Sequence, residues 1–123
     1  MGMSKISNII LTVTNLETAL GFYRDVLGMK VNATIPEEFA FLDGGGVVLA
    51  LREGTDKSNP GLTEIVFEVD DVRTTYEELK GKGVVFPYSP RAITGNETSE
   101  LYATDFRDPD GHILSITSWI TKK

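Results

Sequence analysis

The chain has 123 residues, 41% of them hydrophobic and 24% charged, proportions that are ordinary for one globular domain. Because it contains no cysteine, disulfides, thiolate metal ligands and a cysteine nucleophile are excluded. A formal net charge of −6, without any cluster of Lys and Arg, argues against a nucleic-acid partner.

The sequence carries no sign of membrane association. No apolar run approaches the roughly 20 residues of a membrane span, and residues 1–5 lack the apolar stretch of a signal peptide. The absence of cysteine also suits a reducing compartment. We therefore expect a cytoplasmic protein that has no membrane partner.

The first predicted elements are a strand and a helix. Residues 8–14 alternate in polarity, and Asn15 is a residue type that caps a helix N-terminus. Apolar residues from Leu16 to Leu27 then follow a helical spacing, and Gly28 suits the left-handed position just past a helix. Three further strands are predicted over residues 30–34, 38–42 and 47–52.

The second half of the chain repeats this order. Residues 64–72 match residues 8–16 place by place, with Asp71 as the second N-cap, and Gly83 ends a shorter helical pattern. Strands are predicted over residues 84–88, 99–107 and 112–119. Residues 89–98, which contain Pro, Gly and Asn, are predicted to form a loop.

The ends of the two halves also match. Asp43-Gly-Gly-Gly-Val-Val-Leu-Ala-Leu51 aligns with Asp108-Pro-Asp-Gly-His-Ile-Leu-Ser-Ile116, and each is a tight turn that enters a strand. A polar linker, residues 54–61, separates the halves. Since neither half has enough apolar surface to stand alone, we predict a single domain, 1–123, built from an internal repeat of residues 6–53 and 62–119.

Two of these segments are similar to the motifs of a known family. Val13-Thr-Asn-Leu-Glu-Thr-Ala-Leu-Gly-Phe-Tyr-Arg-Asp-Val-Leu-Gly28 resembles the opening of the vicinal oxygen chelate superfamily, which includes glyoxalases, bleomycin-resistance proteins and extradiol dioxygenases. Residues 108–116 resemble its closing motif. The resemblance implies an α+β fold in which two βαβββ modules in tandem form curved mixed sheets around a cleft. It also implies a homodimer.

The resemblance further implies where a metal would bind. Metal-dependent relatives place His, Glu or Gln ligands at four matched positions, which here are Asn8, Ala50, Glu64 and Ser115. Divalent metals in such sites need imidazole or carboxylate ligands, and only Glu64 provides one. We therefore expect no metal and no cofactor, and Glu64 is the candidate catalytic residue if the protein is an enzyme.

Alternation extends this set to a candidate binding face. Thr12, Arg52, Glu68 and Trp119 fall on the same face as the four positions, whereas the opposite faces are uniformly apolar and are expected to pack under the helices. Aromatic residues on other strands would add walls to the cleft, although the sequence does not fix their facing; core or dimer-interface roles stay open, as does a structural Glu64–Arg52 ion pair. These aromatic residues are Phe39, Phe41 and Tyr102. The candidate ligand-binding set is Asn8, Thr12, Arg52, Glu64, Glu68, Tyr102, Ser115 and Trp119.

The single histidine, His112, follows Gly111 in the closing turn. We predict an exposed turn residue, with a catalytic role as the less favoured alternative.

The function that these patterns favour is metal-independent binding of a small organic molecule, for sequestration or resistance. Acidic residues beside aromatic walls suit a cationic or aromatic ligand. The alternatives are a glyoxalase-like lyase or isomerase with Glu64 as general acid or base, a dioxygenase-related enzyme, and a module that binds a protein partner.

Overall fold

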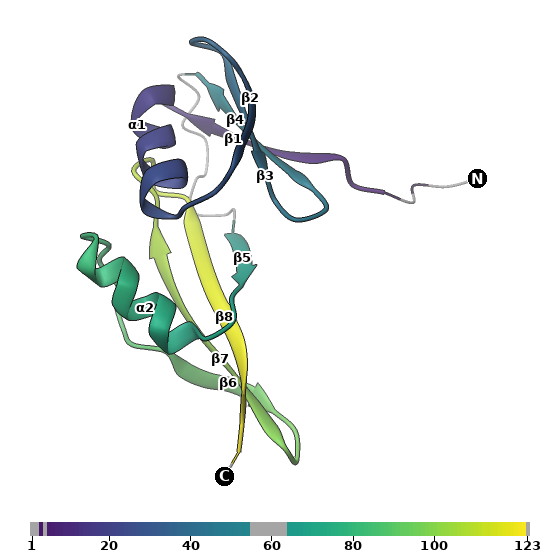
Figure 1. Cartoon of the computed structure of the whole chain (residues 1–123), viewed down its shortest axis with the longest axis vertical. Helices are drawn as coiled ribbons and strands as arrows, with labels where there is room; N and C mark the ends of the chain where they lie inside the picture. The colour runs from purple at the N-terminus through teal and green to yellow at the C-terminus, as the bar shows by residue number, and fades with distance from the viewer. Residues whose placement is uncertain (1–2, 4, 55–63, 123) are drawn as a thin grey trace. The chain divides into compact units, whose positions relative to one another are not determined.

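The computed structural model describes residues 3, 5–54 and 64–122, and the chain forms two compact units, Met1–Ser58 (unit 1) and Asn59–Lys123 (unit 2). Each unit holds one copy of the repeat and is described by itself (Figure 1). Unit 1 contains β1 (Asn8–Val13), α1 (Leu16–Leu20), the π-helical turn η1 (Gly21–Val26), β2 (Val31–Ile35), β3 (Phe39–Asp43) and β4 (Val48–Glu53). Unit 2 contains β5 (Glu64–Glu68), α2 (Val72–Gly81), β6 (Arg91–Gly95), β7 (Ser99–Arg107) and β8 (Ile113–Thr121).

The two sheets have the same topology. Unit 1 orders its strands β1-β4-β3-β2 and unit 2 orders them β5-β8-β7-β6. In each, the first strand pairs in parallel with the last, and the other pairs are antiparallel. The predicted α+β fold of two tandem βαβββ modules is therefore confirmed. A cleft shared by the two modules stays a prediction.

Both helices begin at the predicted caps. The Asn15 side chain accepts a hydrogen bond from Thr18 N–H at 2.9 Å, and the Asp71 side chain accepts one from Arg73 N–H at 3.0 Å. Gly28 and Gly83 follow the helices with φ of 76° and 94°, the left-handed conformation that glycine tolerates best.

The first N–H of each helix is also held by the last strand of its unit. Leu16 N–H donates to Glu53 Oε2 at 2.9 Å, and Val72 N–H donates to Ser118 Oγ at 2.9 Å. These acceptors occupy equivalent places in β4 and β8. Because the first N–H groups of a helix lack partners within the helix, these bonds tie each helix to its sheet.

One face of each sheet is buried against the helix of its unit (Figure 1), as the apolar alternation predicts. In unit 1 the buried face carries Leu11, Val13, Leu49 and Leu51, and in unit 2 it carries Leu114 and Ile116. At about 25 cal/mol per Å² of apolar surface, this burial dominates the stability of each unit.

Residues 84–98 differ from the sequence prediction. The strand expected over residues 84–88 is absent; instead Tyr88 O accepts a hydrogen bond from the Thr104 hydroxyl at 2.7 Å, and Phe86 packs edge-on against Phe106. The expected loop at 89–98 contains β6, which pairs with β7. Of the turn residues that suggested a loop, Gly95 and Asn96 lie at the tip of this hairpin, where Asn96 Oδ1 accepts from Ser99 N–H at 2.9 Å, whereas Pro90 precedes β6.

The first helix differs as well. The α-helical spacing predicted up to Leu27 holds only through Leu20. Leu27 N–H then donates to Phe22 O, five residues back, which is the spacing of a π-helix. No helix within the described part of the chain is long and apolar enough to cross a membrane.

Candidate functional site

We call the sheet face opposite the helix the open face of each unit. Residues that are directly paired in a ladder project to the same side, so the registers define these faces. The open face of unit 1 carries Asn8, Ile10, Thr12, Ala33, Ile35, Phe39, Phe41, Asp43, Val48, Ala50 and Arg52. The open face of unit 2 carries Glu64, Val66, Glu68, Arg91, Thr94, Ser99, Leu101, Ala103, Asp105, Arg107, Ile113, Ser115, Thr117, Trp119 and Thr121.

Glu64 and Ser115 are bonded to each other on the open face of unit 2. β5 and β8 run in parallel, and the Ser115 hydroxyl donates to Glu64 Oε2 at 2.6 Å. Ser115 is only 6% exposed, whereas Glu64 is exposed. The carboxylate therefore has one oxygen held by the sheet while its side chain remains accessible.

The other two family positions lie in unit 1. Ala50 is 1% exposed and lies between Ile10 and Phe41 in the ladder. Asn8 is exposed, and its amide donates to Ser7 Oγ at 3.2 Å. The centre of this open face is therefore apolar.

Arg52 lies at one end of the same face. Its guanidinium donates to Thr12 Oγ1 at 2.9 Å, and the ladder places it between Thr12 and Phe39. Phe39 and Phe41 stack with ring centroids 5.5 Å apart and an interplanar angle of 6°. Their facing, which the sequence left open, is settled: both project from the open face.

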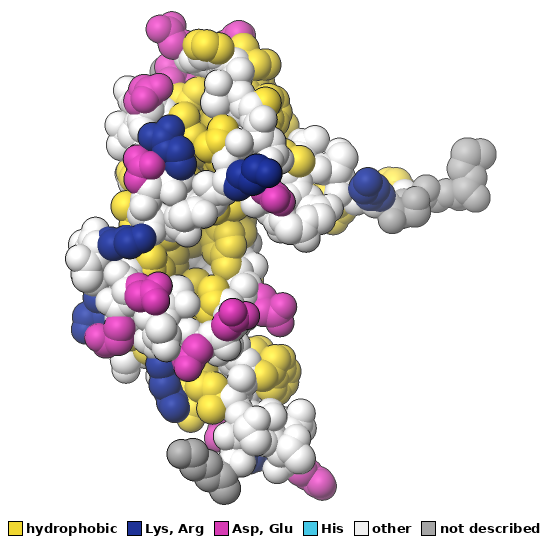
Figure 2. Space-filling model, viewed as in Figure 1, with side chains coloured by type: hydrophobic (Ala, Val, Ile, Leu, Met, Phe, Trp, Pro, Cys, Tyr) yellow, Lys and Arg dark blue, Asp and Glu magenta, His cyan; other side chains and the backbone are white. Residues whose placement is uncertain are grey.

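Trp119 and Glu68 lie on the open face of unit 2, as alternation predicts. Glu68 pairs with Thr117, and Trp119 pairs with Leu101. Trp119 is 50% exposed and Val66 is 57% exposed. Hydrophobic side chains reach the surface of both units (Figure 2).

Tyr102 does not belong to this set, which corrects the prediction. It pairs with Ser118, whose hydroxyl accepts from the first N–H of α2, so Tyr102 projects toward the helix side of the sheet. There the guanidinium of Arg73 lies 4.8 Å from its ring centroid. The sheet separates Tyr102 from the Glu64–Ser115 pair, because residues of β7 alternate between faces.

His112 is also corrected: it is buried, with 6% exposure, rather than exposed in the turn. The turn folds back on itself, since Asp108 Oδ1 accepts from His112 N–H at 2.8 Å and Asp108 N–H donates to His112 O at 3.0 Å. This closed turn carries the histidine into the interior.

Three residues that the sequence analysis did not single out join the open face of unit 2. Asp105 pairs directly with Ser115, and its Oδ2 accepts from the Tyr88 hydroxyl at 2.9 Å. The guanidinium of Arg91 lies 4.1 Å from the centroid of the Tyr88 ring. The hydrogen bond to Asp105, together with burial, raises the pKa of Tyr88. Alternation along β7 was the sequence signal that could have placed Asp105 on the open face. No feature of the sequence indicated that Tyr88 contacts Asp105.

Comparison with known proteins identifies the family. The model of the glyoxalase/bleomycin resistance protein/dioxygenase superfamily matches residues 5–116. The chain belongs to this superfamily.

Several known proteins resemble the chain over most of its length. YraH, an uncharacterized protein of Bacillus subtilis, is 32% identical, and the match covers 91% of this chain and 96% of YraH. The metallothiol transferase FosB of Shouchella clausii is 29% identical over 90% of this chain and 77% of FosB. The crystal structure of virulence protein STM3117 from Salmonella typhimurium superposes with a TM-score of 0.76 at 26% identity, covering 98% of this chain and all of that chain.

The residues present do not fit the divalent metal of metal-dependent glyoxalase-superfamily members. Of the four matched positions, Ala50 has no donor atom and Asn8 offers a neutral amide. The Ser115 hydroxyl is already committed to Glu64. Across residues 3, 5–54 and 64–122, no group of three or more His, Cys, Asp or Glu side chains is placed to hold a metal ion.

Proposed function

We propose that this protein is a metal-independent member of the glyoxalase superfamily that binds a small organic molecule, in a sequestering or resistance role. The observation that carries the proposal is the Glu64–Ser115 bond. A carboxylate at a family ligand position is oriented by a neighbouring hydroxyl, with its other oxygen available to a ligand.

The open face of unit 2 suits a flat ligand with a positive group. The half-exposed Trp119 provides aromatic surface, and Glu64 and Glu68 provide negative charge. Aromatic rings and carboxylates together attract organic cations through cation–π and ionic interactions. A cleft that joins the open faces, a cytoplasmic location and a homodimer stay predictions.

A lyase or isomerase activity is the second candidate. Its support is the same carboxylate: an exposed Glu64 held in a fixed orientation is able to take a proton from a bound substrate. The two candidates differ in what happens to the bound molecule. A binding protein uses the charge of Glu64 and releases the molecule unchanged, whereas an enzyme that uses Glu64 for proton transfer converts the molecule to a product.

The test is a thermal-shift screen of small aromatic amines on protein of known metal content, repeated with the variants Glu64→Gln and Glu100→Gln. Glu100 pairs with Ile120 on the helix side, so the second variant makes the same charge change away from the open face. We expect Tm increases in wild type and in Glu100→Gln that disappear in Glu64→Gln. Equal Tm shifts in all three proteins would exclude Glu64 from the binding site. If NMR shows that a bound compound is converted to a product, the lyase or isomerase is favoured.

A further inference from the structure

Unit 2 differs from unit 1 in how far its last strand extends. In unit 1, β1 and β4 end together at the pair Val13–Glu53. In unit 2, the last pair between β5 and β8 is Glu68–Thr117, whereas β8 continues beside β7 through residues 118–121. Figure 1 shows β8 running past the end of β5 toward the C-terminus. This part of β8 therefore has a neighbouring strand on one side only.

The backbone groups of Trp119 and Thr121 point to the side that lacks a strand. Val69 N–H donates to Thr117 O at 2.9 Å, so the backbone of Thr117 faces β5. Backbone groups alternate between the two edges of a strand, so Trp119 and Thr121 face the same way as Thr117. Within residues 64–122, their N–H and C=O groups form an unpaired sheet edge beyond the end of β5.

The side chains along this edge leave apolar surface exposed. Trp119, on the open face, is 50% exposed, and Thr121 on the same face is exposed as well. Ile120 is half-buried and lies on the helix side of the sheet, where it pairs with Glu100. Unpaired backbone groups beside exposed apolar side chains favour the addition of another strand.

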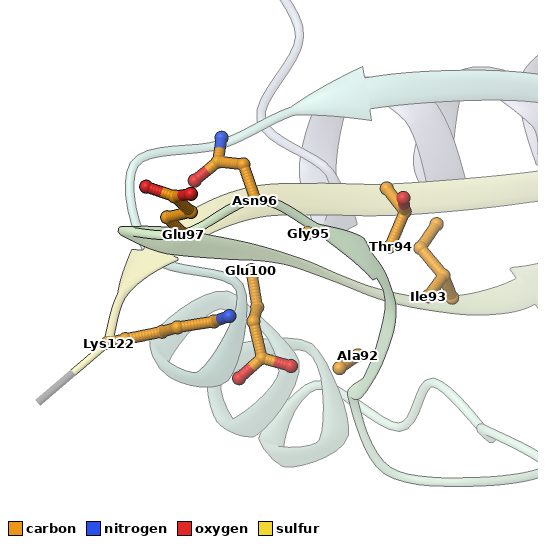
Figure 3. A pocket seen from close by; sticks show the side chains of 8 residues that line it. All are labelled: Ala92, Ile93, Thr94, Gly95, Asn96, Glu97, Glu100 and Lys122. Atoms are coloured by element: carbon orange, nitrogen blue, oxygen red, sulfur yellow. The ribbon is translucent and has the colours of Figure 1, made fainter.

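Opposite charges lie at the two ends of the edge. At one end the Ser118 hydroxyl accepts from the first N–H of α2, so Asp70 and Asp71, which are exposed and directly precede α2, lie near Ser118. At the other end is Lys122, whose side chain extends to the helix side of the sheet (Figure 3). Among residues 64–122, no ion pair involves Lys122 or these two aspartates.

We propose that a second copy of the chain pairs its own β8 with this edge, antiparallel, about a twofold axis at Ile120. Trp119 then forms a hydrogen-bonded pair with Thr121 of the second copy, and the symmetric pair forms as well, so the exposed backbone groups of both copies satisfy one another. The two Ile120 side chains meet on the helix side. The two Trp119 rings are diagonal neighbours on the open face, within contact of each other.

The charges favour a second copy over an unrelated strand. In this pairing Lys122 lies opposite Ser118 of the second copy, on the side where Asp70 and Asp71 carry negative charge. Twofold symmetry makes this contact twice. The pairing also occupies the free edge of both copies, so assembly closes at a dimer. Glu64 lies at the other end of β5 and takes no part in it.

The test follows the dimer and its interface in one titration. Trp119 is the only tryptophan of the chain, so its emission reports on this edge. Mass by light scattering and the wavelength of tryptophan emission are measured across micromolar concentrations for wild type, Thr121→Pro and Thr121→Ala. Proline removes the N–H that faces the free edge but no bond to β7, since the backbone of Thr121 points away from β7. Alanine keeps this N–H and is the matched control.

We expect wild type and Thr121→Ala to dimerise, with Trp119 emission moving to shorter wavelength as the dimer forms. In Thr121→Pro the dissociation constant of the dimer should rise about tenfold or more, while the circular dichroism spectrum stays that of wild type. Lys122→Glu, which leaves the backbone intact, should also raise this constant, and by less at high salt.

Three results would overturn the proposal: a wild-type monomer at every concentration, a dimer that forms without a change in Trp119 emission, or equal dimerisation of Thr121→Pro and wild type. If Thr121→Pro does not fold, Lys122→Glu decides, and an unchanged dissociation constant in that variant rules out this edge as the interface.

Discussion

Ser115 Oγ donates a 2.6 Å hydrogen bond to Glu64 Oε2, and this bond joins the two family ligand positions of unit 2. In a metal-binding relative, both positions would direct ligand atoms at a cation. Here one side chain is a donor and the other an acceptor, so the two satisfy each other.

Glu64→Gln should weaken the binding of an aromatic amine while leaving the fold intact. Loss of one charge-assisted hydrogen bond corresponds to about 1.5–3 kcal/mol, or at least tenfold in affinity. Isothermal titration of benzylamine into wild type, Glu64→Gln and the helix-side control Glu100→Gln measures the effect. Wild-type affinity in Glu64→Gln would show that the residue is structural or that the ligand binds elsewhere.

Purified protein should contain no stoichiometric divalent cation, because Asn8, Ala50 and Ser115 supply too few ligand atoms of the required kind. Elemental analysis checks the content, and a melting curve with and without EDTA should give the same Tm. A bound metal that contacts Glu64 together with Asn8 or Ser115 would contradict this prediction.

Tyr88→Phe should lower the free energy of unfolding by about 1–2 kcal/mol at pH 7, because the hydrogen bond to Asp105 is lost. The folded state raises the pKa of Tyr88, so the contribution of this bond is fully present below the ordinary tyrosine pKa of about 10 and is lost as pH rises through the raised value. Urea denaturation between pH 7 and 11 should therefore show the two proteins converging at high pH.

Tyr76→Phe is the control for that experiment, since the contacts of Tyr76 with Phe86 and Lys80 involve its ring. A constant difference between wild type and Tyr88→Phe across this pH range would mean that packing, not the phenol hydroxyl, is responsible.

Ser118→Ala should destabilise the protein by about 1–3 kcal/mol. The buried N–H of Val72 loses its acceptor, and water has little access to replace it. Chemical denaturation checks this against Thr121→Ala, an exposed change on the same strand that should stay within about 0.5 kcal/mol of wild type. Similar losses in both variants would show that the Ser118 bond has no special weight.

The protein should form a homodimer, because a second copy of the chain would bury apolar side chains that are exposed in the single chain. Examples are Ile6, Val85 and Val66, which are 66%, 83% and 57% exposed. Light scattering at micromolar concentration should then give twice the chain mass of 13.5 kDa. A monomer mass under those conditions would refute the dimer.

The sequence by itself determined the repeat, the helix caps and the inner faces of the sheets. These features depend on local chemistry: alternation fixes which side chains share a face, and Asn15 and Asp71 bond to the amides that directly follow them. The resemblance to the family placed Glu64 and Ser115 at matched ligand positions, and the two registers of the repeat supported that assignment.

The tertiary structure alone decided which distant residues meet. The sequence left the facing of Tyr102 open, because its strand was recognised but its register was not, and pairing with Ser118 places it on the helix side of the sheet. A shift of one residue moves every side chain of a strand to the opposite face, so facing follows from register and not from composition. The Tyr88–Asp105 bond joins a segment without ladder pairing to β7, and only the folded path of residues 84–90 brings the two together.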